Sequence, residues 1–170
     1  MARLAGVSHA APYAHFEDKE DLVEALKEEG FRELRDLIAA ALAAGPAEPL
    51  ARLRLAGQLY LRFAFEQPAK YEIMMRRPLK REPKPSTTYV ATGRELFQLL
   101  AVEVARLQAE REPRAGASPD IAAMASWSAL HGLCALWTGG PMALIAPEGT
   151  QIEALAERVL DYVLAALVSG

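Results

Sequence analysis

Apolar residues recur along most of this chain at spacings of three and four, which is the periodicity of amphipathic helices. No segment shows the alternation of apolar and polar residues that predicts a strand, and no Asn-Gly or Asp-Gly hairpin turn is present. The sequence therefore predicts an all-α protein. Prolines, glycines and capping residues divide the pattern into helices over about 9–15, 18–44, 47–67, 68–75, 87–111, 119–138 and 150–168.

The two helices nearest the C-terminus differ in their apolar pattern. The helix over 119–138, with Ser118 as its N-cap, is apolar on nearly every side, so we expect it to be buried on two faces. The helix over 150–168 carries one apolar stripe. A helix that is apolar all round beside a striped terminal helix indicates a homodimer interface built from these two helices.

Composition narrows the class of protein further. A chain of 170 residues with 52% hydrophobic and 24% charged residues forms one ordinary domain, or two small units that share a core. The single cysteine, Cys134, excludes an internal disulfide framework. No signal-peptide pattern opens the chain, and the apolar stretch 121–137 is too short and too polar for a membrane span. We therefore expect a cytoplasmic protein.

The net charge of −3 means that any surface for nucleic acid must be small and local. Residues 2–22 offer such a surface, because they are typical of a helix end, a Gly-Val-Ser turn, a short helix and the start of a long helix. This is helix-turn-helix geometry, in which the second helix enters the major groove. The predicted DNA contacts are Ser8, His9, Ala10 and Ala11 at the N-terminal end of the short helix, with Tyr13, His15 and Lys19 donating to phosphates.

The same segment resembles the DNA-binding region of the TetR/AcrR family. The family signature combines Ala-Gly-Val-Ser, Tyr-x-His-Phe and Lys-Glu-x-Leu, and these motifs stand here at residues 5–8, 13–16 and 19–22. The C-terminal half resembles the subgroup whose regulatory domain carries Trp, His and Gly, here Trp127, His131 and Gly132, and residues 60–75 fit that subgroup too.

The resemblance implies a partial helix-turn-helix unit with a connecting helix over 1–44, followed by a helical regulatory domain over 45–170 for ligand binding and dimerisation. It also implies a homodimeric repressor that a small apolar ligand releases from operator DNA. The family's DNA-binding unit has three helices, and the first would lie upstream of the residues seen here. We expect that Met1 is a misplaced start; the alternative is a ligand-binding helical dimer that does not bind DNA because this helix is absent.

Bulky aromatic and sulfur-containing side chains beside one polar group are typical of a ligand cavity. The candidates are Phe63, Tyr71, Met74, Trp127, His131, Cys134 and Trp137. Core packing is the alternative for each of them.

His131 and Cys134 stand three positions apart on one helix, which raises two further possibilities. A metal site would need two more ligands, and an enzyme would need a third group to orient the pair. We therefore expect no metal, no cofactor and no enzymatic activity, with an enzyme acting on an apolar ligand as the remaining alternative. We expect the basic run 76–84 to be a solvated loop rather than a DNA-binding surface.

Overall fold

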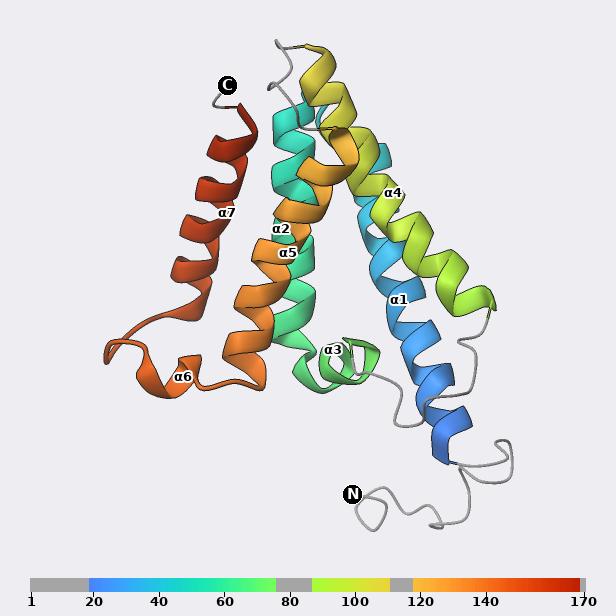
Figure 1. Ribbon diagram of the computed structural model, residues 1–170, viewed down its shortest axis with the longest axis vertical. Coiled ribbons are helices and arrows are strands. Elements are labelled where there is room, and N and C mark those ends of the chain that lie inside the picture. The colour runs from blue at the N-terminus through green and yellow to red at the C-terminus, as the bar shows by residue number, and fades with distance from the viewer. Residues whose placement is uncertain (1–18, 76–86, 111–117, 169–170) are drawn as a thin grey trace.

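The computed structural model describes residues 19–75, 87–110 and 118–168, and these ranges form helices joined by short connections (Figure 1). The prediction of an all-α fold is confirmed. The helices are α1 (Lys19–Ala44), α2 (Pro49–Glu66), α3 (Pro68–Met75), α4 (Thr87–Ala109), α5 (Pro119–Thr138), α6 (Met142–Ile145) and α7 (Ile152–Val168). The predicted helix over 9–15 lies outside the described residues.

Capping residues set the ends of two central helices. The carboxylate of Glu48 accepts hydrogen bonds from the backbone N–H groups of Leu50 at 3.0 Å and Ala51 at 2.6 Å, so α2 begins at Pro49. Ser118 is the N-cap of α5, as predicted, and its hydroxyl accepts from the N–H of Ile121 at 3.4 Å. These side chains satisfy N–H groups that the helices themselves leave unpaired.

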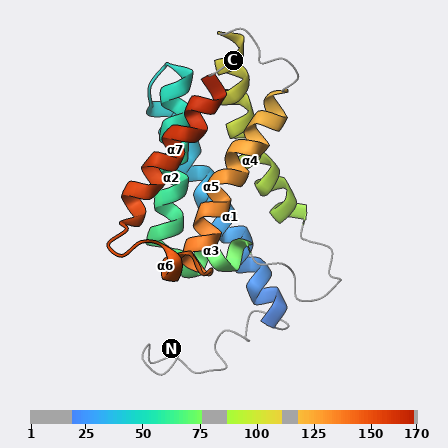
Figure 2. The same cartoon turned by 60° about the vertical axis from the view of Figure 1, so that its left-hand side comes forward.

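The helices pack as a bundle around one core. α1 and α4 lie side by side, α2 and α5 occupy the centre, and α7 packs on the other side of this central pair (Figures 1 and 2). The short helix α3 packs against α1 and α2 at one end of the bundle. The largest fully buried side chains come from five helices and include Leu34, Tyr71, Met74, Leu107, Cys134 and Leu160.

The N-terminal helix shares this core with the rest of the chain. α1 packs against α2, α3 and α4, and its residues Phe31, Leu34, Ile38 and Leu42 are buried. The division of the chain at residues 44 and 45 stays a prediction. The structure does show that α1, before that division, packs against α2, α3 and α4, which follow it.

The expectation that α5 is buried on two faces is wrong for the single chain. Its inner face packs against α2, α4 and α7, and Ser126 and Leu130 are buried there. On the outer face Ile121 is 63% exposed and Leu136 is 50% exposed, because no described helix of the chain covers them. The apolar pattern on all sides of this helix therefore does not tell whether both faces are buried within one chain or one apolar face remains exposed.

The segment 121–137 is predicted to be too short and too polar for a membrane span, but the whole of α5, with 20 residues, is long and apolar enough to cross a membrane. A helix in the core of a globular domain can have the same length and composition, so this finding alone does not indicate a membrane span. In this fold α5 packs against five other helices, and Ala123 and Cys134 are fully buried in the shared core.

Candidate functional site

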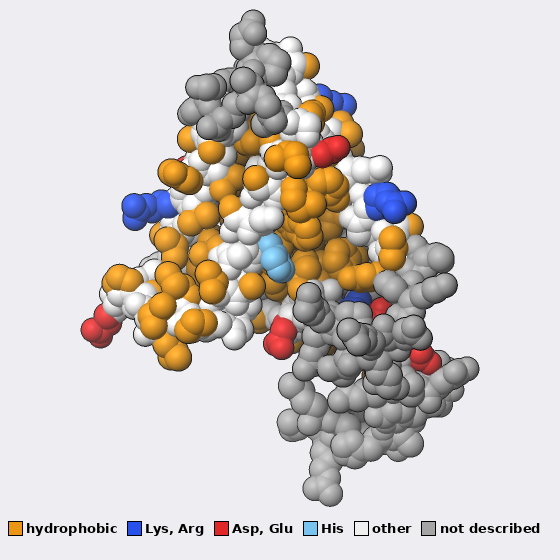
Figure 3. All heavy atoms as spheres, in the orientation of Figure 1, with side chains coloured by type: hydrophobic (Ala, Val, Ile, Leu, Met, Phe, Trp, Pro, Cys, Tyr) orange, Lys and Arg blue, Asp and Glu red, His pale blue; other side chains and the backbone are white. Residues whose placement is uncertain are grey.

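An apolar cavity of about 250 Å³ lies among α1, α2, α4, α5 and α7. Hydrophobic side chains gather around its mouth on the face between α4 and α5 (Figure 3). The lining residues come from every one of these helices: Phe31, Ile38, Leu53, Ala56, Gly57, Tyr60, Gly93, Leu96, Phe97, Leu99, Leu100, Met124, Ser126, Trp127, Leu130, Leu160, Val163, Leu164 and Leu167.

The size and the wall of the cavity suit a small apolar molecule. None of its lining residues is charged, and only Tyr60, Ser126 and Trp127 carry polar atoms in their side chains. An apolar cavity of about 150 Å³ is large enough to bind benzene, and sites for drug-sized ligands begin at about 300 Å³. The volume here lies between these values, so the space fits a compact molecule of roughly ten non-hydrogen atoms.

A chain of polar side chains leads from the cavity wall into the protein. Trp127 Nε1 donates to Tyr60 Oη at 3.3 Å, and Tyr60 Oη lies 2.8 Å from Tyr71 Oη. His131 Nδ1 lies 2.6 Å from Tyr71 Oη and 3.2 Å from Tyr60 Oη. Four side chains from α2, α3 and α5 are thus joined by hydrogen bonds, which lets these polar groups lie at the edge of an apolar core.

Burial keeps this cluster uncharged near neutral pH. Desolvation raises the pKa of the Tyr60 and Tyr71 hydroxyls and lowers the pKa of His131. It also raises the pKa of the Cys134 thiol to about 11, so this buried cysteine stays protonated and unreactive. The described residues contain no group of three His, Cys, Asp or Glu side chains that could hold a metal ion.

The predicted ligand residues fall into different places. Trp127 lines the cavity, whereas Tyr71 and His131 belong to the polar chain behind it. Phe63, Met74 and Cys134 are packed in the core, and Trp137 is half-buried away from the cavity lining. A ligand role for these residues stays a prediction.

Sequence reasoning missed most of the cavity wall, including all of its residues from α1, α4 and α7. Phe31, Leu96, Phe97 and Leu100 occupy ordinary apolar positions of amphipathic helices. Their spacing gives the same signal whether the side chain faces a neighbour or an empty space. Of the two glycines that line the cavity, only Gly93 could have hinted at missing volume, because a Cβ on Gly57 would clash with Leu160.

The predicted DNA contacts cannot be placed in this fold. Ser8, His9, Ala10, Ala11, Tyr13 and His15 lie outside the described residues, as does the basic run 76–84. Lys19 is the first residue of α1, and its side chain is not among those described. α1 is the described helix that follows, in the sequence, the segment predicted to hold the helix-turn-helix motif.

Two contacts join α1 directly to α4, the helix on the opposite wall of the cavity, and a third joins them through α2. The rings of Phe31 and Tyr89 meet edge to face with centroids 5.2 Å apart. Arg35 Nη1 donates to Glu95 Oε2 at 2.6 Å, and this pair is exposed. At the other end of α1, Arg52 and Glu103 form a clamp.

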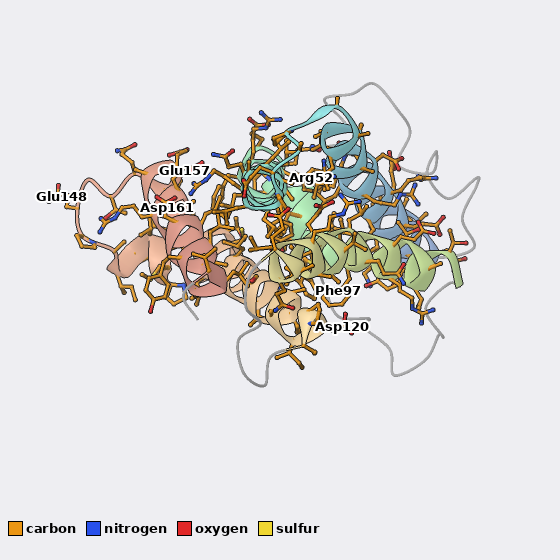
Figure 4. The ribbon with its side chains drawn as sticks, turned by 90° about the horizontal axis from the view of Figure 1, so that it is seen from above. Arg52, Phe97, Asp120, Glu148, Glu157 and Asp161 are labelled. Atoms are coloured by element: carbon orange, nitrogen blue, oxygen red, sulfur yellow. The ribbon has the colours of Figure 1, made fainter. Side chains whose placement is uncertain are left out.

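The clamp of Arg52 and Glu103 connects three helices. Arg52, on α2, donates from Nε and Nη2 to the two carboxylate oxygens of the buried Glu103 on α4, both at 2.8 Å. Its Nη1 donates to the backbone oxygens of Leu42 at 2.7 Å and Pro46 at 3.1 Å, at the C-terminal end of α1. Figure 4 shows Arg52 on α2 beside α1. The hydrogen bonds to Glu103 raise the pKa of Arg52, so its guanidinium group stays charged.

The described residues thus form an all-helical bundle with an apolar cavity and a long helix, α1, that extends from it. Residues 53–163 match the family model described as "Tetracyclin repressor-like, C-terminal domain". The chain belongs to the TetR family and is a transcriptional regulator by class.

Solved structures share this fold. A protein with unknown function from Rhodococcus sp. RHA1 has a TM-score of 0.75 and 26% identity over 99% of this chain and 82% of its own chain. The TetR family transcriptional regulator PfmR from Thermus thermophilus has a TM-score of 0.72 and 21% identity over 96% of this chain and 85% of its own, which shows the fold alone. No curated protein matches this chain.

Proposed function

We propose that this regulator is a cytoplasmic repressor without enzymatic activity, and that a small apolar ligand in the cavity releases it from operator DNA. One observation carries the proposal: Phe31 and Ile38 of α1 form part of the cavity wall. A ligand that wedges between α1 and α4 would contact the helix that leads to the helix-turn-helix motif. It can shift that helix only if it binds the released state better than the DNA-bound state.

A second copy of the chain is the proposed partner of the outer face of α5 and α7. Ile121 and Leu136 on α5 are exposed, and Tyr162 on α7 is 79% exposed. Asp120 is the only charged residue of α5, so the face is apolar along its length. Exposed apolar area of this kind marks an interaction site, and two helices from each copy would form a four-helix interface. Operator DNA, read by two motifs in one dimer, is the second proposed partner.

The cavity proposal is tested by filling the cavity. Gly93 lies on the wall, where an added Cβ would meet Phe31 Cδ1 and Cε1 at 3.8–3.9 Å, so Gly93→Leu should occupy the space without a clash at Cβ. Ala91→Leu places the same side chain on the exposed side of α4 as a control. Binding of labelled DNA from the region upstream of the coding sequence is measured by fluorescence anisotropy, with ligands extracted from the host added in series.

The expected result is DNA binding by all three proteins, with ligand-induced release in the wild type and Ala91→Leu but not in Gly93→Leu. Release from Gly93→Leu at wild-type ligand concentrations would contradict the cavity as the ligand site. A folded dimer that binds no DNA would instead support a ligand-binding dimer without DNA-binding activity.

The dimer proposal is tested on the outer face of α5. Leu136→Arg places a charge in the proposed interface, and Val102→Arg does the same at an exposed apolar position on α4. Analytical ultracentrifugation should show a dimer for the wild type and Val102→Arg and a monomer for Leu136→Arg. A dimer in all three proteins would place the interface elsewhere.

A further inference from the structure

The hydrogen bonds at the cavity wall determine which polar group a ligand can bring. Three lining side chains carry polar atoms, and each donor among them is already used. Ser126 Oγ donates to the backbone oxygen of Ala122 at 2.8 Å. The indole N–H of Trp127 has no acceptor function, so in its contact with Tyr60 the tyrosine oxygen is the acceptor.

We assign the direction of the remaining hydrogen bonds from their lengths and from a neutral His131. The separation of 2.6 Å between Tyr71 Oη and His131 Nδ1 lies in the range for an O–H donor and is short for an N–H donor. Tyr71 therefore donates its single proton to an unprotonated Nδ1. The Tyr60 proton then goes to Tyr71 Oη at 2.8 Å, or is shared with His131 Nδ1 at 3.2 Å.

In this assignment the hydroxyl protons of Tyr60 and Tyr71 point away from the cavity and toward His131. Among the described residues no buried side-chain nitrogen or oxygen lacks a hydrogen-bond partner. The polar capacity left on the wall consists of acceptor lone pairs, one on Tyr60 Oη and one or more on Ser126 Oγ. The wall offers neither a free donor nor a cation.

We propose that the cavity selects an uncharged, compact hydrophobic ligand whose polar group is a hydroxyl, that is, an alcohol or a phenol. Such a ligand can donate its proton to Tyr60 or Ser126. A ketone or ester of the same shape would lose its hydrogen bonds to water and find no donor, and a carboxylate would also lose its hydration without a counter-charge. This inference rests on the proposed function only in taking the cavity as the ligand site.

The test uses four probes with one bicyclic hydrocarbon skeleton: indane, 1-indanol, 1-indanone and indane-1-carboxylate. Binding to the full chain is measured at pH 8 by isothermal titration calorimetry. We expect 1-indanol to bind about three- to tenfold more tightly than 1-indanone, which is the range for one net hydrogen bond. We expect the carboxylate not to bind. Equal or tighter binding of the ketone, or binding of the carboxylate, would overturn the proposal.

Two variants test the direction of the hydrogen bonds between Tyr60, Tyr71 and His131. Tyr60→Phe removes the acceptor and frees the indole N–H of Trp127, so the preference for alcohol over ketone should be lost or reversed, while indane binding is retained. His131→Phe removes the final acceptor, so the Tyr71 proton can turn to Tyr60 and the Tyr60 proton to the cavity, which should reverse the preference in favour of 1-indanone. Thr88→Val removes an exposed hydroxyl of α4 outside the cavity lining and should leave the ratio unchanged.

The outcomes separate this inference from the proposed function. If indane binds but the wild type does not prefer the alcohol, the ligand class is wrong and the cavity remains a ligand site. If none of the probes binds, both proposals fail. Thermal unfolding of each variant establishes that it is folded, and the wild-type series decides the proposal if either variant is not.

Discussion

The close approach of α2 and α7 at the cavity wall gives a prediction that can be worked out in numbers. Leu160 on α7 is 1% exposed, and a Cβ built on Gly57 of α2 would lie 2.6 Å from its Cδ1 atom. Gly57→Ala should therefore push a buried side chain out of place, which costs about 1–3 kcal/mol, against a gain of about 1 kcal/mol in helix propensity. The expected net effect on the wild type is a loss of at most about 2 kcal/mol.

Leu160→Ala alone should cost about 2–5 kcal/mol, because it enlarges a cavity that the surrounding helices do not fill. In that background the clash disappears and Gly57→Ala should become stabilising by about 1 kcal/mol. The four proteins of this double-mutant cycle are compared by urea denaturation, and the coupling energy should be about 1–3 kcal/mol. Additive effects of the two substitutions would refute the close contact between α2 and α7.

Three further predictions concern other parts of the chain. Burial lowers the pKa of His131, so below about pH 6.5 the unfolded state binds more protons than the folded state. The free energy of unfolding should therefore fall as the pH decreases through that range. Denaturation curves of His131→Phe should lack this part of the pH dependence. Glu103→Gln keeps the shape of the side chain but weakens the clamp with Arg52. It should lower the thermal midpoint, measured by differential scanning calorimetry, more than Glu95→Gln does, because the ion pair of Glu95 with Arg35 is exposed. In a DNA-binding form of the protein, Lys19→Ala should weaken binding to all sequences alike and reduce its dependence on salt, because phosphate contacts position rather than specify; a changed operator preference in a binding-site selection would contradict that role.

The helices were predictable because strong local signals mark their ends. The sequence predicts α3 and α5 with the bounds found in the structure, since Pro68 and the Ser118-Pro119 pair each favour one starting point. The bounds of α1, α2, α4 and α7 differ from the prediction by at most two residues at each end. The short helix α6 was missed because its four residues carry no periodic pattern.

The cavity was less predictable than the helices, for a physical reason. Aromatic and sulfur-containing residues led to Phe63 and Met74, but in the fold these side chains fill space in the core rather than border empty space. A cavity is a shortage of volume shared by several helices. No single sequence position indicates that shortage. The hydrogen bond between Trp127 and Tyr60 could not be predicted either, because it depends on a tertiary contact between α5 and α2.

The clamp at the C-terminal end of α1 also gives this helix a fixed end. α1 has 26 residues, so it is a rod of about 39 Å at 1.5 Å per residue. Arg52 holds the backbone at Leu42, while Phe31, about midway along the rod, touches the cavity. A rotation of about 5° around the clamped end would displace the wall at Phe31 by little more than 1 Å but Lys19 by roughly 3 Å. If α1 rotates around the clamp, it acts as a lever: a small displacement at the cavity wall becomes a larger displacement at the N-terminal end of the helix.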